Sequence, residues 1–559
     1  MNCNPTSPRM NHLATADYVV FGIYLVVVVG YGYWVYQRKR AAEMSTSDFF
    51  LAEGSLTWWA IGASLIASNI SAEHFIGMAG SGFAMGLAIS SYEWIAAATL
   101  VIVAVFFIPI YLRNHIYTMP QFLAQRYSDT VSTILAVFWL VVYVVVNLTS
   151  ILYLGAIAIE SLAGISFTIC TIGLAVFAIF ITLGGMKVIG YTDVIQVVVL
   201  VFGGLVVTYL ALQLVAEQSG GLTSGIAGVW NGMVTLRQEA DSHFHMFFAK
   251  GHPYYEVLPG MALVTGGMWI NNLSYWGCNQ YIVQRALGAD LKTARSGILF
   301  AAFLKLMIPL IVVVPGIAAY VLYQSGPFRA AMTDASGVVK PDQAYPVLMN
   351  LLPVGMKGLA FAALTAAIVA SLAGKCNSIS TIFTLDIYKK YLNKTASEQK
   401  LVNVGRWAVL VSFAVAVAIA PMLRSLDQVY QYIQEYTNFI TPGVFAIFLL
   451  GFFWKRATNR AALTVAILTI PMSILLKFWP EVTSLVGIES DSIPFLHRTT
   501  WVFCIDVALM VVVSLTDPTQ AATGKGLIVD RQLFHVSRSF VAGSIAIFAI
   551  LAVLYSVFW

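Results

Sequence analysis

Polar and ionisable side chains lie in the middle of several long apolar segments of this sequence. They include His74, Glu93, Asn272, Lys305, Gln431, Gln434 and Glu435. In hydrocarbon, each such group is costly unless protein or enclosed water satisfies it. Carboxylate, ammonium, imidazole and amide groups together can hydrogen-bond the hydroxyls of a sugar, while nearby aromatic rings cover its apolar face. The set therefore indicates a binding site for a small solute that is multiply hydroxylated, polar or zwitterionic.

The segment from Gly62 to Trp94 is apolar enough for a bilayer, yet Ser68, Asn69 and Glu73 lie at its centre, and closely spaced glycines follow. An interrupted membrane helix is tolerated where it lines a cavity, and in transporters it is a pointer to the binding site. No strand precedes the glycines, so a nucleotide-binding loop is excluded and close helix packing or a hinge is favoured.

The composition is that of a helical membrane protein that crosses the bilayer many times. The chain has 559 residues, of which 59% are hydrophobic and 10% charged, whereas a soluble protein has about 25% charged residues. The net charge of +5 comes from loops and does not indicate a nucleic-acid partner. Five scattered cysteines suggest neither a disulfide framework nor a structural metal. We expect no organic cofactor and no obligate protein partner.

Hydropathy predicts fourteen spans. They are 18–36, 57–80, 86–112, 130–160, 165–184, 190–216, 257–284, 296–324, 344–375, 402–424, 428–453, 459–479, 499–515 and 536–558. Basic residues concentrate in alternate loops, as at residues 38–40 and at Arg285, and such loops face the cytoplasm. This predicts a protein of the cell (inner) membrane with both termini on the extracellular or periplasmic side. The outer loop 217–256 has room for a short helix at most.

A second interrupted span, 257–284, contains GGMWINNLSYWGCNQY and begins a second set of five spans. Broken helices at corresponding positions of two halves mark an inverted repeat. The expected organisation is 1–56 as the N-terminal outside segment and first extra helix, 57–216 as the first half, 217–256 as a loop, 257–453 as the second half, and 454–559 as three C-terminal helices.

Two lysines have alternative interpretations. Lys305 lies inside an apolar span, and snorkelling to the interface and a buried role are equally compatible with its position. Lys375 follows Ser371 by one helical turn, in a run whose hydroxyls and strained carbonyls could bind sodium. Its place near a helix end favours an interfacial lysine over a built-in cation beside an ion site.

Several motifs in order along residues 15–559 resemble the sodium/solute symporter family, and within it the bacterial sodium/galactose and sodium/glucose transporters. They include GASLIASNISAEHFIG, SYEW, NQYIVQRAL, NSISTIFTLDIYKKY and FLLGFFWKR. The resemblance implies an all-α fold with the five-plus-five inverted repeat of the leucine transporter (LeuT), with one helix before it and three after. It implies sodium-coupled symport of a hexose by alternating access. No HExxH or GxSxG motif indicates a membrane enzyme.

The resemblance also assigns roles to residues. It implies a sugar site of His74, Glu93, Asn272, Lys305 and Gln434, an outer lid of Met78, Tyr92 and Tyr430, and an inner gate of Tyr275 beside Trp276. The sodium site would comprise the carbonyls of Ala67, Ile70 and Ala367 and the hydroxyl of Ser371, with Asp193 along the ion path. Ala370 stands where the family has a first serine.

The family leaves the solute and the coupling open. A sodium-independent sugar facilitator or a sugar sensor is one alternative, which Ala370 and Lys375 motivate. A sodium symporter of inositol, sialic acid or proline is another, since a fold does not fix its substrate.

Overall fold

The computed structural model describes residues 13–37, 56–221, 224–326, 328–333, 337–350, 352–425, 429–485, 487–517 and 527–559. This part of the chain is helical, and its β-structure is limited to one bridge between Thr333 and Val339. It contains ten helical stretches long and apolar enough to cross a membrane, and two shorter apolar helices. Each of the fourteen expected spans overlaps helical residues, and the number of crossings stays a prediction. The basic run 38–40 lies outside the described residues.

The first part of the chain runs to the end of α11. Its helices are α1 (Thr15–Gln37), α3 (Trp58–Asn69), η1 (Glu73–Met78), α4 (Ala79–Met85), η2 (Gly86–Ser90), α5 (Ser91–Phe106), α6 (Ile108–Arg113), α7 (Met119–Arg126), α8 (Asp129–Val141), η3 (Val142–Leu148), α9 (Thr149–Ala163), α10 (Phe167–Thr182) and α11 (Gly185–Gln218).

The second part runs to α22. It comprises α12 (Gly225–Glu239), η4 (Asp241–Phe244), α13 (Ala262–Thr265), α14 (Gly267–Cys278), α15 (Gln280–Leu287), α16 (Leu291–Gln324), α17 (Arg329–Met332), η5 (Pro341–Gln343), α18 (Ala344–Asn350), α19 (Met356–Thr381), η6 (Ile382–Leu392), α20 (Glu398–Ile419), η7 (Ala420–Ser425), α21 (Val429–Thr437) and α22 (Thr441–Phe453). The last helices are α23 (Asn459–Lys477), α24 (Trp479–Ser484), α25 (Phe495–Thr516), η9 (Arg531–Phe534) and α26 (Arg538–Val557).

Both predicted interruptions are present. Helix α3 ends at Asn69, and Ile70 has extended backbone with φ −76° and ψ 123° before the π-helix η1 begins. The Ser71 hydroxyl accepts a hydrogen bond from the Glu73 N–H at 3.1 Å, a local side-chain contact that competes with a continuous helix. Helix α14 likewise ends at Cys278, and the extended Asn279 separates it from α15. The two breaks leave helix ends free to bind solutes or ions.

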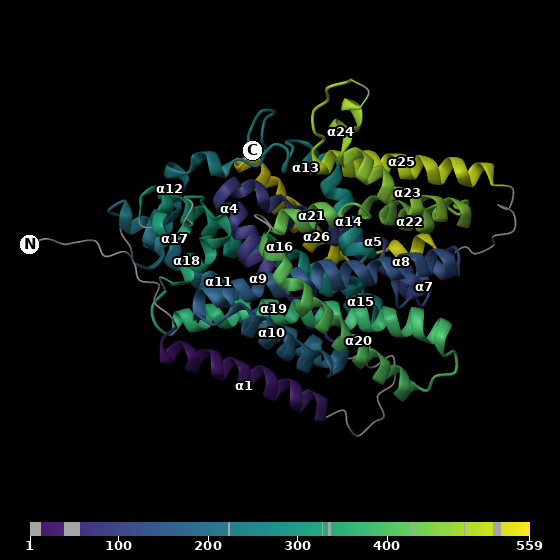
Figure 1. Cartoon of the computed structure of the whole chain (residues 1–559), viewed down its shortest axis with the longest axis horizontal. Helices are drawn as coiled ribbons and strands as arrows, with labels where there is room; N and C mark the ends of the chain where they lie inside the picture. The colour runs from purple at the N-terminus through teal and green to yellow at the C-terminus, as the bar shows by residue number, and fades with distance from the viewer. Residues whose placement is uncertain are drawn as a thin grey trace, which may run out of the picture.

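The long helices lie side by side along the horizontal direction of Figure 1. Helix α16 packs against α3 and α5, and α11 packs against α19, so the broken helix α3 is enclosed by unbroken ones. Helix α1 lies at one edge of this view and α25 at the opposite edge. The broken helices therefore sit within the helical bundle rather than at its rim.

The C-terminal end of the chain contacts a loop that is expected outside, and the first turn of α1 contacts the start of α19. The Phe558 carbonyl accepts a hydrogen bond from the Met246 N–H at 2.8 Å, in the loop 217–256. The Asp17 carboxylate accepts hydrogen bonds from the N–H groups of Gly355 and Gly358 at 2.7 and 2.8 Å, near the start of α19. The loop 217–256 contains the 15-residue helix α12, which is longer than the short helix expected there.

Candidate functional site

A cavity lies between the two broken helices, and residues from both halves of the chain line it. Its lining includes all five residues expected at the sugar site, which are His74, Glu93, Asn272, Lys305 and Gln434. The space between the lining atoms, including the open mouth, is about 1060 Å³. Side chains that are far apart in the sequence thus face one shared space.

Lys305 and Glu93 form a buried ion pair at this cavity. The Lys305 ammonium nitrogen lies 2.5 Å from Glu93 Oε2, and the side chains are 1% and 4% exposed. His74 Nε2 lies 3.4 Å from the other oxygen, Glu93 Oε1. Because Lys305 on α16 points inward, the snorkelling interpretation is wrong. The cluster offers a cation, a carboxylate and an imidazole to a solute that carries hydroxyl groups.

Asn69, the last residue of α3, connects this ion pair to the second broken helix. Its amide oxygen accepts a hydrogen bond from Lys305, and its amide nitrogen donates to the Tyr275 hydroxyl at 2.8 Å. The hydroxyl groups of Tyr275 and Tyr281 are also hydrogen-bonded. From the sequence, Asn69 was recognised as a polar residue in an apolar segment, but no role was predicted for it. Its position immediately before a helix break was the available signal.

Aromatic rings cover part of the lining. The Lys305 ammonium lies 5.2 Å from the centre of the Trp276 ring, a cation–π contact, and Trp276 packs edge-to-face on Tyr275. Tyr92 also lines the cavity. Met78 is fully buried on η1 and lies outside the lining, so the structure does not bring it to the cavity. The side chain of Tyr430 lies outside the described residues.

The residues expected at the sodium site lie where α3 ends against α19. The Ser371 hydroxyl of α19 donates a hydrogen bond to the Ser68 carbonyl of α3 at 3.0 Å. Ala67, Ile70 and Ala367 are buried there with exposed fractions of 1% or less. A helix ending leaves its last carbonyls without intrahelical partners and places partial negative charge there. Hard cations prefer such oxygens, so the position fits a sodium ion, and Ala370 adds no hydroxyl oxygen to it.

Lys375 lies inside the molecule, not at an interface. Its side chain is on the buried helix α19, and the residue is 2% exposed and lines the cavity. The ammonium nitrogen is 3.4 Å from the Ser371 hydroxyl oxygen and 5.2 Å from the centre of the Tyr281 ring. The interpretation as an interfacial lysine is therefore wrong. Four residues separate Lys375 from Ser371, so both share the helix face that packs on α3 and α15.

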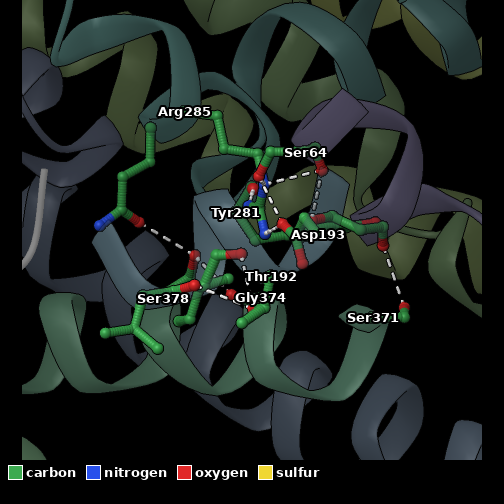
Figure 2. Close-up of polar contacts among 12 residues, drawn as sticks. Ser64, Thr192, Asp193, Tyr281, Arg285, Ser371, Gly374 and Ser378 are labelled. Atoms are coloured by element: carbon green, nitrogen blue, oxygen red, sulfur yellow. Dashed lines mark hydrogen bonds and ion pairs between the residues drawn. The ribbon is translucent and has the colours of Figure 1, made fainter. Parts of the chain in front are cut away.

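Asp193 on α11 belongs to a buried polar cluster beside the same helix. The Ser64 hydroxyl donates to Asp193 Oδ2 at 2.5 Å, and Arg285 Nε donates to the Ser64 hydroxyl at 2.9 Å and to its carbonyl at 3.0 Å. Arg285 Nη2 lies 3.8 Å from Asp193 Oδ2. Figure 2 shows Arg285, Ser64 and Asp193 gathered at α3, with Ser371 to one side. The cluster links α3, α11 and α15.

Arg285 was expected in an inside loop, and that expectation is wrong. The residue is 1% exposed and also donates to the Tyr281 carbonyl on its own helix. It lies only six residues after the break at Asn279, too short a helical distance to leave the bundle at about 1.5 Å per residue. The short distance between the break and Arg285 could have indicated its buried position, but counting basic residues per loop does not take that distance into account.

Comparison with known proteins shows that the chain matches a protein family. The model of the sodium:solute symporter family matches residues 49–469. A sodium/glucose cotransporter of Vibrio parahaemolyticus is 46% identical over 98% of this chain and 99% of its own length. Sodium/glucose cotransporter 1 of Ovis aries is 34% identical over 80% of this chain and 69% of its own, and sodium/myo-inositol cotransporter 2 of Sus scrofa is 33% identical over 85% and 73%.

Solved structures show the same fold. A Na⁺-coupled sialic acid symporter in its substrate-bound outward-open state has a TM-score of 0.73 at 21% identity, covering 90% of this chain and 98% of its own. Mhp1, a nucleobase-cation-symport-1 family transporter, has a TM-score of 0.51 at 15% identity, with 90% and 99% covered. The expected LeuT-type fold is confirmed.

Proposed function

This chain belongs to the sodium:solute symporter family, and on that premise we propose that it carries a hexose, glucose or galactose, into the cell together with sodium. The observation that carries this proposal is the buried network of Lys305, Glu93 and His74, in a cavity that is also lined by side-chain amides and several aromatic rings. Such donors and acceptors match the hydroxyls of a sugar ring. The name of the relative from Vibrio parahaemolyticus supports the same solute.

The end of α3 would couple the solute to the ion. The Ser68 carbonyl is held by Ser371 at the expected ion position, and the neighbouring Asn69 side chain is bound to Lys305 in the sugar site. A change at either position therefore reaches the other through one peptide unit. In the proposed cycle, sodium from outside stabilises an outward-open form, the sugar binds at mid-membrane, the lids close and both are released inward.

The available driving force is sufficient for accumulation. One sodium ion moving through about 100 mV releases about 2.3 kcal/mol, and a tenfold sodium gradient adds about 1.4 kcal/mol. At about 1.4 kcal/mol per tenfold of solute, one sodium per sugar would sustain roughly 500-fold accumulation.

We further propose that residues 57–216 and 257–453 are the two halves of the repeat and that both termini lie outside. The broken helices α3 and α14, at corresponding places in these ranges, support the division. The contact between the C-terminal Phe558 and the loop 217–256 supports a common side for both segments.

A second candidate solute is myo-inositol, another cyclic polyol, which the names of several relatives favour.

Uptake by purified protein in liposomes tests both the hexose and the myo-inositol proposals. Labelled glucose, galactose and myo-inositol are supplied with an inward gradient of sodium or of potassium. We expect sodium-stimulated hexose uptake that Gln434→Ala abolishes and that Gln213→Ala, a partly exposed glutamine on α11, leaves unchanged. Absence of uptake of either hexose would refute the substrate, and equal uptake in both cations would refute sodium coupling.

A further inference from the structure

Helix α21, which carries Gln434, is a short helix that is separate from α22. It spans nine residues, and a turn over 438–440 lies between it and the start of α22 at Thr441. Because the turn interrupts the helix, α22 does not by itself fix the direction of α21. Helix α21 packs on η1 and η3, two segments that contribute residues to the cavity. The direction in which Gln434 faces therefore depends also on what holds the other side of α21.

Glu435, the residue after Gln434, binds the C-terminal helices. Its carboxylate oxygen Oε1 lies 2.5 Å from Arg498 Nη2 on α25 and 3.3 Å from Lys477 Nζ on α23. Successive residues of an α-helix point in directions about 100° apart. Gln434 accordingly lines the cavity, while Glu435 points toward α23 and α25. The two side chains share one turn of helix, so the ion pairs of Glu435 bear directly on the position of Gln434.

The contacts of Glu435 are partly buried and form a network. The side chains of Arg498, Lys477 and Glu435 are 10%, 19% and 28% exposed. The Lys477 ammonium also donates to the Tyr436 hydroxyl at 3.1 Å and lies 4.2 Å from the centre of the Tyr436 ring. Partly buried charges are screened by salt less than exposed ones, and a network holds better than an isolated surface pair. Helix α21 is therefore attached to α23 through two consecutive residues and to α25 through one of them.

We propose that Glu435 is a positioning residue for solute binding, which keeps the Gln434 amide turned toward the cavity by anchoring α21 to α23 and α25. The inference rests on the proposed function, in which Gln434 binds the hexose. Without the anchor, α21 can rotate or shift at the turn 438–440, and the amide then meets the sugar hydroxyls less often. Two helices outside the proposed repeat thereby set the affinity for the solute, although none of the described residues that line the cavity belongs to them.

The test is equilibrium binding of labelled glucose or galactose to purified protein in saturating sodium. Glu435→Gln, which removes both ion pairs, should raise the hexose dissociation constant by about fivefold or more. Arg498→Met and Lys477→Met each leave one pair in place and should raise it less. Arg498→Lys keeps the charge and should lie closer to the wild type than Arg498→Met. Asp129→Asn, which breaks an ion pair with Lys390 between residues that do not line the cavity, is the matched control and should bind hexose as the wild type does.

Binding of radioactive sodium without solute, together with thermal unfolding, separates positioning from a general structural role. We expect Glu435→Gln to keep the sodium dissociation constant of the wild type and a cooperative thermal transition, because the expected ion position lies at the end of α3. Equal hexose affinity of wild type and Glu435→Gln would overturn this inference and leave the proposed function standing. Parallel loss of hexose and sodium affinity would also overturn it, because the ion pairs would then hold the fold as a whole. If the wild type bound neither hexose, the proposed substrate and this inference would both fail.

Discussion

At the scale of single residues, the site depends on a buried charge pair. The Lys305 ammonium lies 2.5 Å from a Glu93 carboxylate oxygen, and neither side chain has appreciable contact with solvent. Removal of one partner of such a pair leaves an uncompensated buried charge. The pair is therefore a constraint on stability as well as a source of donors and acceptors for the solute.

Lys305→Met or Glu93→Gln alone should destabilise the protein by about 3–5 kcal/mol, because either change leaves one charge buried without its partner. The double variant should lose less free energy of unfolding than the two single variants lose together, because it leaves no unpaired charge buried. Thermal unfolding in detergent measures this, with Lys390→Met as a control from the partly exposed ion pair with Asp129, expected to cost less than about 1 kcal/mol. Strictly additive losses would contradict the pairing.

Ala370→Ser should tighten sodium binding several-fold, because a hydroxyl at this fully buried position beside Ser371 supplies an oxygen that the site lacks. The half-saturating sodium concentration for hexose uptake is the measurement. Ala416→Ser, another fully buried alanine on the separate helix α20, serves as the control. An unchanged sodium requirement in Ala370→Ser would count against this ion position.

The sequence predicted the polar residues of the cavity better than it predicted its charges. His74, Glu93, Asn272, Lys305 and Gln434 stand out because polar groups are costly in an apolar span, and all five line the cavity. Lys375 and Arg285 were misplaced, because a count of charges along the chain ignores which helix face they occupy. Both proved to be 2% exposed or less. The pairing of Lys305 with Glu93 required the packing of α16 on α5, which no local pattern specifies.

At the scale of elements, the segment after η1 depends on a close approach that requires glycine. Gly86 has φ +73°, and a Cβ atom there would overlap the backbone of His243 in η4. This contact fixes the turn between α4 and α5, the helix that carries Tyr92 and Glu93. The glycine-rich spacing in the sequence predicted close packing or a hinge, and the structure shows close packing at this position.

Gly86→Ala should therefore destabilise the protein by at least about 1–3 kcal/mol, through the left-handed backbone conformation and the overlap together. Gly30→Ala on α1 is the matched control, because nothing lies within 4 Å of a Cβ atom at Gly30. It should be neutral or slightly stabilising, since alanine is the better helix former. Similar melting temperatures of the two variants would show that the turn does not need glycine.

At the scale of the whole molecule, hydropathy and the two interruptions predicted a helical bundle with an inverted repeat, and the family resemblance implied the LeuT-type fold. The breaks at Ile70 and Asn279 lie where the polar stretches indicated. Boundaries were less predictable, because short helices such as α4, η2 and α15 divide the spans. The 15-residue helix α12 is also longer than the short helix allowed for, since its glycine-rich sequence gives a weak helical pattern and its stability comes from packing on α11.

The central claim is that this molecule uses a sodium gradient to concentrate a hexose. The most direct measurement is the steady-state ratio of internal to external labelled glucose or galactose in liposomes, with an inward sodium gradient and a negative interior. We expect a ratio well above tenfold, from the driving force of about 3.7 kcal/mol, and its collapse when a sodium ionophore is added. A ratio that stops at unity with sodium and with potassium alike would contradict the claim.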